Sequence, residues 1–124
     1  MTALYIAAGG VIGTLARYYL EGWIQHRSGS SFPLGTLMIN LAGSLLIGFI
    51  LRLATGAAVI SPEWRAALTV GFCGAFTTMS TFSYESVRLL GDGDYWHAAL
   101  YIGGTVVGCF LAVVAGTMLA NRLL

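Results

Sequence analysis

The segment that decides the fold reads GFCGAFTTMSTFSYE, from Gly71 to Glu85. Two glycines are followed by a cluster of hydroxyl residues: Thr77, Thr78, Ser80, Thr81 and Ser83. Glycine and hydroxyl side chains both weaken an uninterrupted helix, so the segment predicts a break. In lipid, a broken helix is tolerated only where protein buries it or where it lines a water-filled cavity. A kink whose hydroxyls cap their own backbone is the alternative interpretation.

The composition around this segment indicates that lipid surrounds most of the chain. Of its 124 residues, 57% are hydrophobic and 9% are charged, whereas soluble domains carry roughly 25% charged residues. So little charge cannot form a polar shell around a soluble fold of this size. The formal net charge of +1 gives no electrostatic basis for binding nucleic acid. The cysteines, Cys73 and Cys109, lie in apolar runs and are interpreted as packing residues.

Four apolar segments are long enough to cross a membrane, which takes about 20 residues in a helix. They are expected at Ala3–Ile24, Pro33–Leu53, Trp64–Leu89 and Tyr95–Asn121. The first is expected to be a span and not a cleavable signal peptide, because MTALYIAAGG lacks a basic start. We therefore predict one all-α integral membrane domain over residues 1–124. It has four transmembrane helices, the third of them broken near the bilayer midplane.

The arginines give no clear orientation in the membrane. Arg52, Arg65 and Arg122 are expected on one side, and Arg27 and Arg88 on the other. The positive-inside rule needs more basic residues on one side of the membrane than on the other, so it predicts no orientation for this chain. One hypothesis is that the chain inserts both ways up. The alternative is that lipid or the insertion machinery sets a single orientation.

Polar residues recur on one face of two predicted spans. The stripes are Thr36, Asn40, Ser44 and Gly48 in the second span, and Tyr101, Thr105 and Cys109 in the fourth. Residues four apart share a helix face. Such stripes either join helices by hydrogen bonds or line a polar path. Asn40 favours the path, because its amide is costly to leave unpaired in lipid.

Small residues predict close packing between helices in lipid. Their positions are Gly9, Gly10 and Gly13 in the first span, and Gly104, Gly108, Ala112 and Gly116 in the fourth. These stripes predict contacts between helices and carry no chemistry.

Three blocks of the chain resemble the fluoride channel family known as Fluc or CrcB. They are GGVIGTLARYY at Gly9–Tyr19, PLGTLMINLAGSLLIG at Pro33–Gly48 and GFCGAFTTMSTFSYE at Gly71–Glu85. With the fourth span, the resemblance covers nearly the whole chain. It implies a passive fluoride-selective channel in the cell membrane that exports fluoride from the cytoplasm and is not an enzyme. It also implies an antiparallel, dual-topology homodimer with two pores.

The resemblance further implies roles for single residues. Asn40 would donate a hydrogen bond to fluoride, and a ring edge of Phe82 would face the ion. Met79 stands where the family has another pore phenylalanine, which removes one ring edge. The implied polar track continues through Thr36, Thr81, Tyr101 and Thr105. Arg17 would lie near the aqueous mouth, or its side chain snorkels to the interface.

A structural sodium ion is also implied, at the centre of the dimer. The carbonyl oxygens of Gly74 and Thr77 from both subunits would hold it. Four neutral oxygens suit a hard cation of this kind.

Two other functions remain open from the residues. A small proton-coupled multidrug or cation exporter needs an acid embedded in the membrane. Only Glu85 is expected near a cavity, and Glu21 is expected at a span end. A non-conducting membrane assembly subunit would use its polar stripes only to join helices. An enzyme is not expected, because His26 and His97 lie in loops away from any candidate nucleophile.

Overall fold

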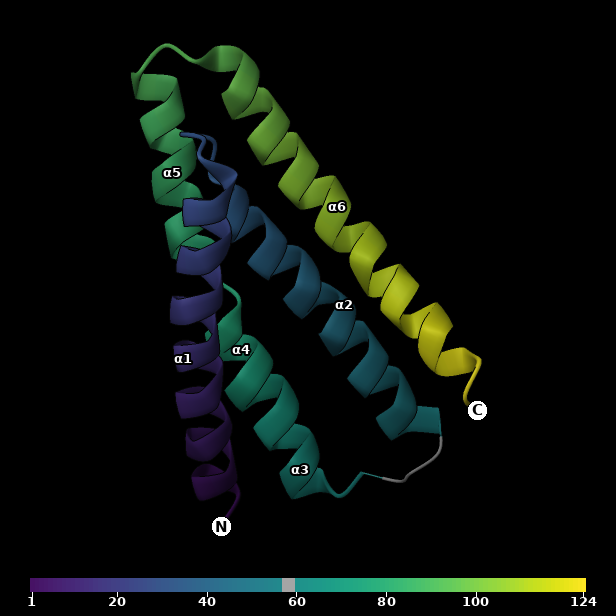
Figure 1. Ribbon diagram of the computed structural model, residues 1–124. Helices are drawn as coiled ribbons and strands as arrows, with labels where there is room; N and C mark the ends of the chain where they lie inside the picture. The colour runs from purple at the N-terminus through teal and green to yellow at the C-terminus, as the bar shows by residue number, and fades with distance from the viewer. Residues whose placement is uncertain (57–59) are drawn as a thin grey trace.

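The computed structural model describes residues 1–56 and 60–124 and shows an all-α arrangement of four spans (Figure 1). Three spans are continuous helices: α1 (Thr2–Ser28), α2 (Leu34–Gly56) and α6 (Tyr95–Asn121). The third comprises α3 (Pro62–Ala66), the π-helical η1 (Ala67–Cys73), α4 (Gly74–Phe76) and α5 (Met79–Gly91). The predicted break in the third span is confirmed. Residues 57–59, in the predicted second connection, lie outside the described residues.

The ends of the helices follow local sequence signals. Helix α1 ends at Gly29, whose φ of 61° is the left-handed conformation that favours glycine. Ser61 caps α3 by accepting a hydrogen bond from the Trp64 N–H, and Pro62 opens the first turn. The fourth predicted span agrees with α6 at both ends, whereas α1 continues past its predicted end at Ile24.

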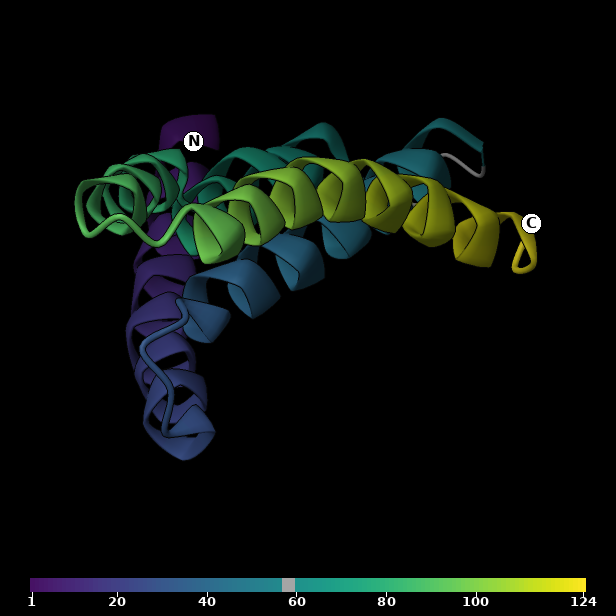
Figure 2. The same ribbon diagram turned by 90° about the horizontal axis from the view of Figure 1, so that it is seen from above.

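The helices pack as two groups. Helices α2 and α6 lie side by side along much of their length, and α1 lies against η1 and α4 (Figures 1 and 2). Both chain ends lie at one end of the molecule, and the α1–α2 and α5–α6 connections lie at the other (Figure 1). This alternation is the one predicted for four crossings of a membrane.

Glycine permits the closest helix contacts. A Cβ at Gly116 would lie 2.0 Å from the carbonyl oxygen of Leu45, and one at Gly9 would lie 2.1 Å from that of Ala67. These contacts join α6 to α2 and α1 to η1 through their backbones. The predicted packing role is confirmed at both glycines. At Gly104 a Cβ would meet no described atom within 4 Å, so this glycine makes no such contact within the single chain.

Two of the helices are by themselves long and apolar enough to cross a membrane. They are α2 and α6, with mean hydropathies of 2.0 and 2.1. Helix α1 is less apolar because it carries Arg17, Glu21 and Arg27, and the third span is divided at its break. Only 17% of the most apolar part of α6 is buried. Such an apolar and exposed helix fits lipid better than water.

Candidate functional site

The break in the third span lies at Thr77 and Thr78, whose backbones are extended. Thr77 closes the upstream helix, because its N–H and its hydroxyl both donate to the Cys73 carbonyl, at 3.0 and 2.9 Å. Thr78 opens α5 as its N-cap, with its hydroxyl accepting from the Thr81 N–H at 3.2 Å. The helix is therefore broken. The hydroxyls of Thr77 and Thr78 also bind nearby backbone groups, as expected for a kink whose hydroxyls cap their own backbone.

The carbonyl groups of Gly74 and Thr77 are among those that the break leaves without their helical partners. In a continuous helix the Thr78 N–H would donate to Gly74, but it donates instead to Asn40 Oδ1 at 2.8 Å. The Thr81 N–H would likewise donate to Thr77, but it donates to the Thr78 hydroxyl. The carbonyl oxygens of Gly74 and Thr77 are thus available to bind a cation.

Asn40 holds the break by two hydrogen bonds to one residue. While its Oδ1 accepts from the Thr78 N–H, its Nδ2 donates to the Thr78 carbonyl at 3.2 Å. Among the described residues, Thr78 is the partner of both ends of this amide. One of the two Nδ2 hydrogens is sufficient for that contact. Sequence reasoning expected Asn40 as a donor and missed this contact with Thr78.

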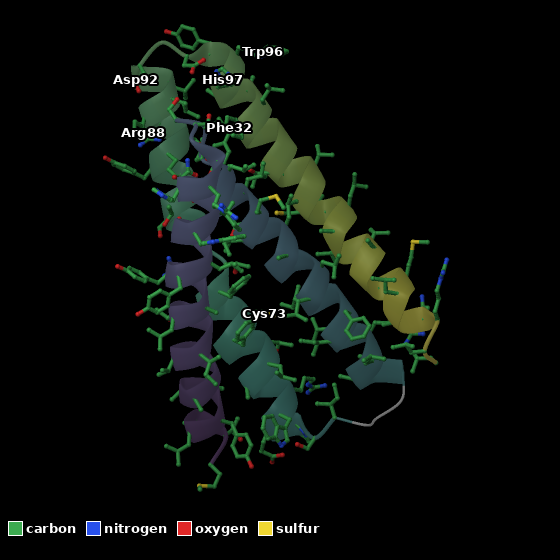
Figure 3. The ribbon with its side chains drawn as sticks, viewed as in Figure 1. Phe32, Cys73, Arg88, Asp92, Trp96 and His97 are labelled. Atoms are coloured by element: carbon green, nitrogen blue, oxygen red, sulfur yellow. The ribbon has the colours of Figure 1, made fainter. Side chains whose placement is uncertain are left out.

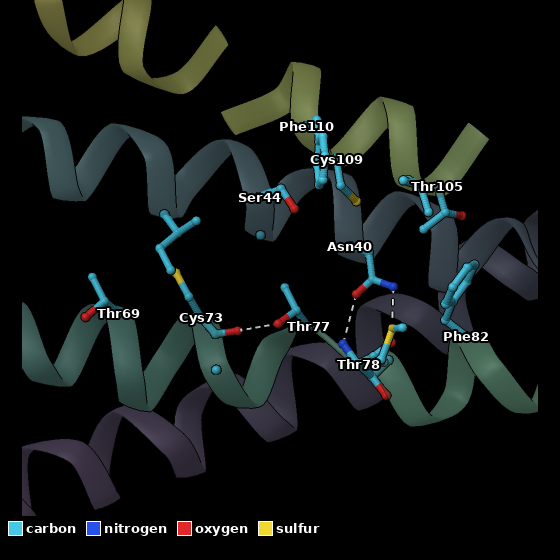
Figure 4. A pocket seen from close by; sticks show the side chains of 15 residues that line it. Asn40, Ser44, Thr69, Cys73, Thr77, Thr78, Phe82, Thr105, Cys109 and Phe110 are labelled. Atoms are coloured by element: carbon cyan, nitrogen blue, oxygen red, sulfur yellow. Dashed lines mark hydrogen bonds between the residues drawn. The ribbon is translucent and has the colours of Figure 1, made fainter. Parts of the chain in front are cut away.

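An open groove of about 520 Å³ runs along the break, between α2, the third span and α6 (Figure 4). It brings together most of the residues predicted for the site: Asn40, Gly74, Thr77, Met79, Phe82 and Thr105. Cys73 and Cys109 also line it, and neither forms a disulfide. Met79 is 72% exposed, so the groove is open on one side of the single chain. Thr81, whose N–H is capped by the Thr78 hydroxyl, is not part of this lining.

The hydroxyl of Thr105 is the one buried side-chain polar atom of the described residues that lacks a hydrogen-bond partner. Thr105 is only 5% exposed and lines the groove. Leaving a buried hydroxyl unpaired costs about 1–3 kcal/mol. This position therefore favours a polar occupant of the groove.

Two further predicted residues, Thr36 and Tyr101, lie beyond the groove, toward the α1–α2 connection. Both are almost completely buried. Tyr101 packs against Phe82, with ring centroids 5.2 Å apart, and its hydroxyl donates to Glu85 Oε1 at 3.0 Å. Tyr101 therefore contacts both Phe82, which lines the groove, and the carboxylate of Glu85.

Thr36 also donates to a carboxylate. Its Oγ1 lies 3.0 Å from Glu21 Oε1, and the Glu21 side chain is 22% exposed. Glu21 lies within α1, which continues to Ser28, and this part of the helix packs against α2 at Gly35. The presence of Thr36 in a polar stripe could have predicted a contact of this kind, because a buried hydroxyl needs a hydrogen-bond partner.

Arg17 takes a position that sequence reasoning did not foresee. Its Nε donates to the carbonyl of Ala75 at 3.0 Å, and its Nη1 lies 3.8 Å from Glu21 Oε2. The side chain thus lies beside the break. The reason is that α1 packs against α4, which brings a carbonyl next to the break within reach.

A polar recess of about 460 Å³ lies at the end where the α1–α2 and α5–α6 connections meet. Glu85 lines it together with Gln25, Arg88, Asp92 and Asp94. Figure 3 shows Arg88, Asp92 and His97 at this end of the molecule. Since Glu85 also binds Tyr101, polar groups connect the groove at the break with this end of the chain.

Known proteins match the chain along almost its whole length. A family model described as CrcB-like protein, Camphor Resistance (CrcB), matches residues 4–117. The chain is 43% identical to a fluoride-specific ion channel FluC of Geotalea uraniireducens and 44% identical to one of Geobacter sulfurreducens, with 98% of each chain covered. A FluC of Chlorobaculum tepidum is 45% identical, over 95% of this chain and 93% of the relative.

The match to the family model contains the break, the groove and both carboxylates beyond it. Together with the identity to full-length relatives, this agreement shows that the chain belongs to the CrcB-like family.

Proposed function

We propose that the chain is a passive, fluoride-selective channel of the cell membrane that lets fluoride leave the cytoplasm. The observation that carries the proposal is a groove with unsatisfied hydrogen-bond donors set among apolar helices. The relatives of the chain are named as fluoride-specific ion channels. Their names favour a channel over a proton-coupled exporter, a non-conducting assembly subunit or an enzyme.

The groove offers donors that can replace the water around a small anion. Fluoride is strongly hydrated, and a hydrocarbon layer excludes a bare ion by on the order of tens of kcal/mol. Asn40 has a second Nδ2 hydrogen, and the Thr105 hydroxyl has no described acceptor. The ring of Phe82 lines the same groove, where an electropositive ring edge can face an anion. Chloride is larger and is held less tightly by such closely spaced donors.

The channel is an antiparallel homodimer with two pores. Gly74 is exposed in the single chain, next to backbone groups that lack helical partners. Lipid cannot satisfy such groups, so protein must cover them. A second copy inserted the opposite way up fits this need and agrees with the nearly even distribution of arginines.

A structural sodium ion lies where the two breaks meet. The carbonyls of Gly74 and Thr77 fit this role, because both have lost their helical hydrogen bonds. A cation held there would also favour an anion in the neighbouring groove.

The purified protein in proteoliposomes is expected to release fluoride rapidly and chloride far more slowly, because the donors suit the smaller ion. A fluoride electrode and a chloride electrode, read after addition of a potassium ionophore, measure the two rates. Protein-free vesicles are the control. Vesicles that retain fluoride, or that lose chloride equally fast, contradict the proposal.

Removal of sodium is expected to reduce fluoride efflux slowly, since the ion is buried between subunits. Vesicles moved from sodium to potassium buffer should lose activity over repeated exchanges and regain it when sodium returns. Elemental analysis of the protein gives the sodium content at each stage. Full efflux from protein shown to be free of sodium rules out this site.

A further inference from the structure

A second groove lies between α1 and the first half of the third span, where α1 packs beside α3 and η1 (Figure 1). It has a volume of about 490 Å³, and its lining residues are apolar or aromatic. It shares no residue with the groove at the break. A second copy that covers the break therefore need not cover this groove.

The groove matches one leaflet of a bilayer in depth. Along α1 it extends from Met1 to Ile12, which is about 16 Å at the rise of a helix. Half of the hydrocarbon core of a bilayer is about 15 Å. Tyr5 and Trp64 line the groove near its outer end, with ring centroids 5.5 Å apart and an edge-to-face arrangement. Aromatic residues of this kind are typical of the membrane surface.

The width of the groove distinguishes between possible occupants. Its volume over this length gives a mean cross-section of about 30 Å². An α-helix with its side chains is about 10 Å wide and needs about 80 Å². A hydrocarbon chain, whose carbon atoms meet their neighbours at about 4 Å, needs less than about 20 Å². The groove therefore fits a single acyl chain and is too narrow for a helix of a second copy.

A positive side chain lies next to the outer end of the groove. Arg65 follows Trp64 in α3, is exposed, and forms no ion pair with any described residue. A guanidinium group can bind a phosphate through two parallel hydrogen bonds. Glu63 lies two positions before Arg65, and residues two apart do not face each other on a helix. The charge next to the groove therefore favours a phosphate.

We infer that this groove binds one acyl chain of an anionic phospholipid, whose phosphate lies at Arg65. Bulk lipid tails are as apolar as the groove, so the preference comes from close packing and from charge. At its inner end the chain contacts Phe72, which stacks on Phe76 with ring centroids 5.3 Å apart. Phe76 directly precedes the extended residues of the break. The bound lipid thus supports the third span beside its break.

Binding of phosphatidylglycerol to the purified, delipidated protein tests the inference. Native mass spectrometry counts the bound lipid, and thermal unfolding in detergent measures the stabilisation. The wild type should hold one phosphatidylglycerol per chain and melt at a higher temperature with it. Ala8→Trp fills the groove with an indole, so both effects should be lost. Ala7→Trp is the matched control, because Ala7 is the exposed neighbour that does not line the groove, and it should equal the wild type.

Arg65→Gln provides a second test should Ala8→Trp fail to fold. Affinity for phosphatidylglycerol is expected to fall about tenfold, because a charge-assisted hydrogen bond is lost. Unchanged binding in a folded Ala8→Trp protein or in Arg65→Gln overturns the inference, as does an equal loss in Ala7→Trp. Size-exclusion chromatography gives the dimer content of each variant. A dimer that dissociates in Ala8→Trp alone also overturns the inference, because the groove then belongs to a contact between copies.

Discussion

Fluoride efflux is expected to fall by about a hundredfold or more when Asn40 is replaced by alanine. The substitution removes the second Nδ2 hydrogen of a side chain that lines the groove, and a hydrogen bond to an ion is worth about 1.5–3 kcal/mol. It also removes both bonds to Thr78, so the extended residues of the break lose the side chain that holds them. Electrode measurements of proteoliposomes, with dimer content checked by size-exclusion chromatography in detergent, give the result.

Two companion variants separate the effects of this substitution. Phe82→Ile leaves the bonds between Asn40 and Thr78 unchanged but removes the ring edge, and is expected to abolish efflux while the dimer persists. Asn121→Ala is the control. It removes an asparagine side chain at the C-terminal end of α6, where the amide accepts a hydrogen bond from Arg52, and it should leave efflux unchanged. Rapid efflux from both Asn40→Ala and Phe82→Ile would show that the ion does not pass through the groove.

The four spans and the break could be predicted because their signals are local. Apolar length predicts a span, and the run of hydroxyl residues after Gly74 weakens a helix within a few residues. The N-capping role of Thr78 belongs to the same local chemistry. The end of α1 was predicted too early, at Ile24, because the polar residues that begin at His26 were assigned to the connection, whereas the helix continues to Ser28.

The contacts that make the site depend on residues far apart in the sequence. Asn40 and Thr78 are 38 residues apart, and Arg17 and Ala75 are 58 apart. No local pattern identifies the carbonyl that a buried arginine or asparagine will meet. The sequence therefore indicated that the Asn40 amide is costly to leave unpaired in lipid. Only the packing of α2 against the break shows which backbone groups this amide binds.

A valine at position 116 is expected to separate α6 from α2 and to prevent the chain from folding stably. The Cβ would lie 2.0 Å from the Leu45 carbonyl oxygen and 2.9 Å from the Phe49 nitrogen. Both atoms belong to the α2 backbone, so no side chain can turn away to make room. Overpacking a core costs about 1–3 kcal/mol, and more where backbones must move. Thermal unfolding in detergent, followed by the loss of monodisperse protein, measures the effect.

Gly103→Val is the matched control for this prediction. It adds the same side chain to the same helix, at a glycine whose Cβ would meet no described atom within 4 Å. Its melting temperature should remain near that of the wild type, because lipid or detergent accommodates the added methyl groups. The α2–α6 contact supports Asn40 and Thr105 on facing helices, so Gly116→Val should also lose efflux. A Gly116→Val protein as stable as Gly103→Val would show that the two helices do not meet through their backbones.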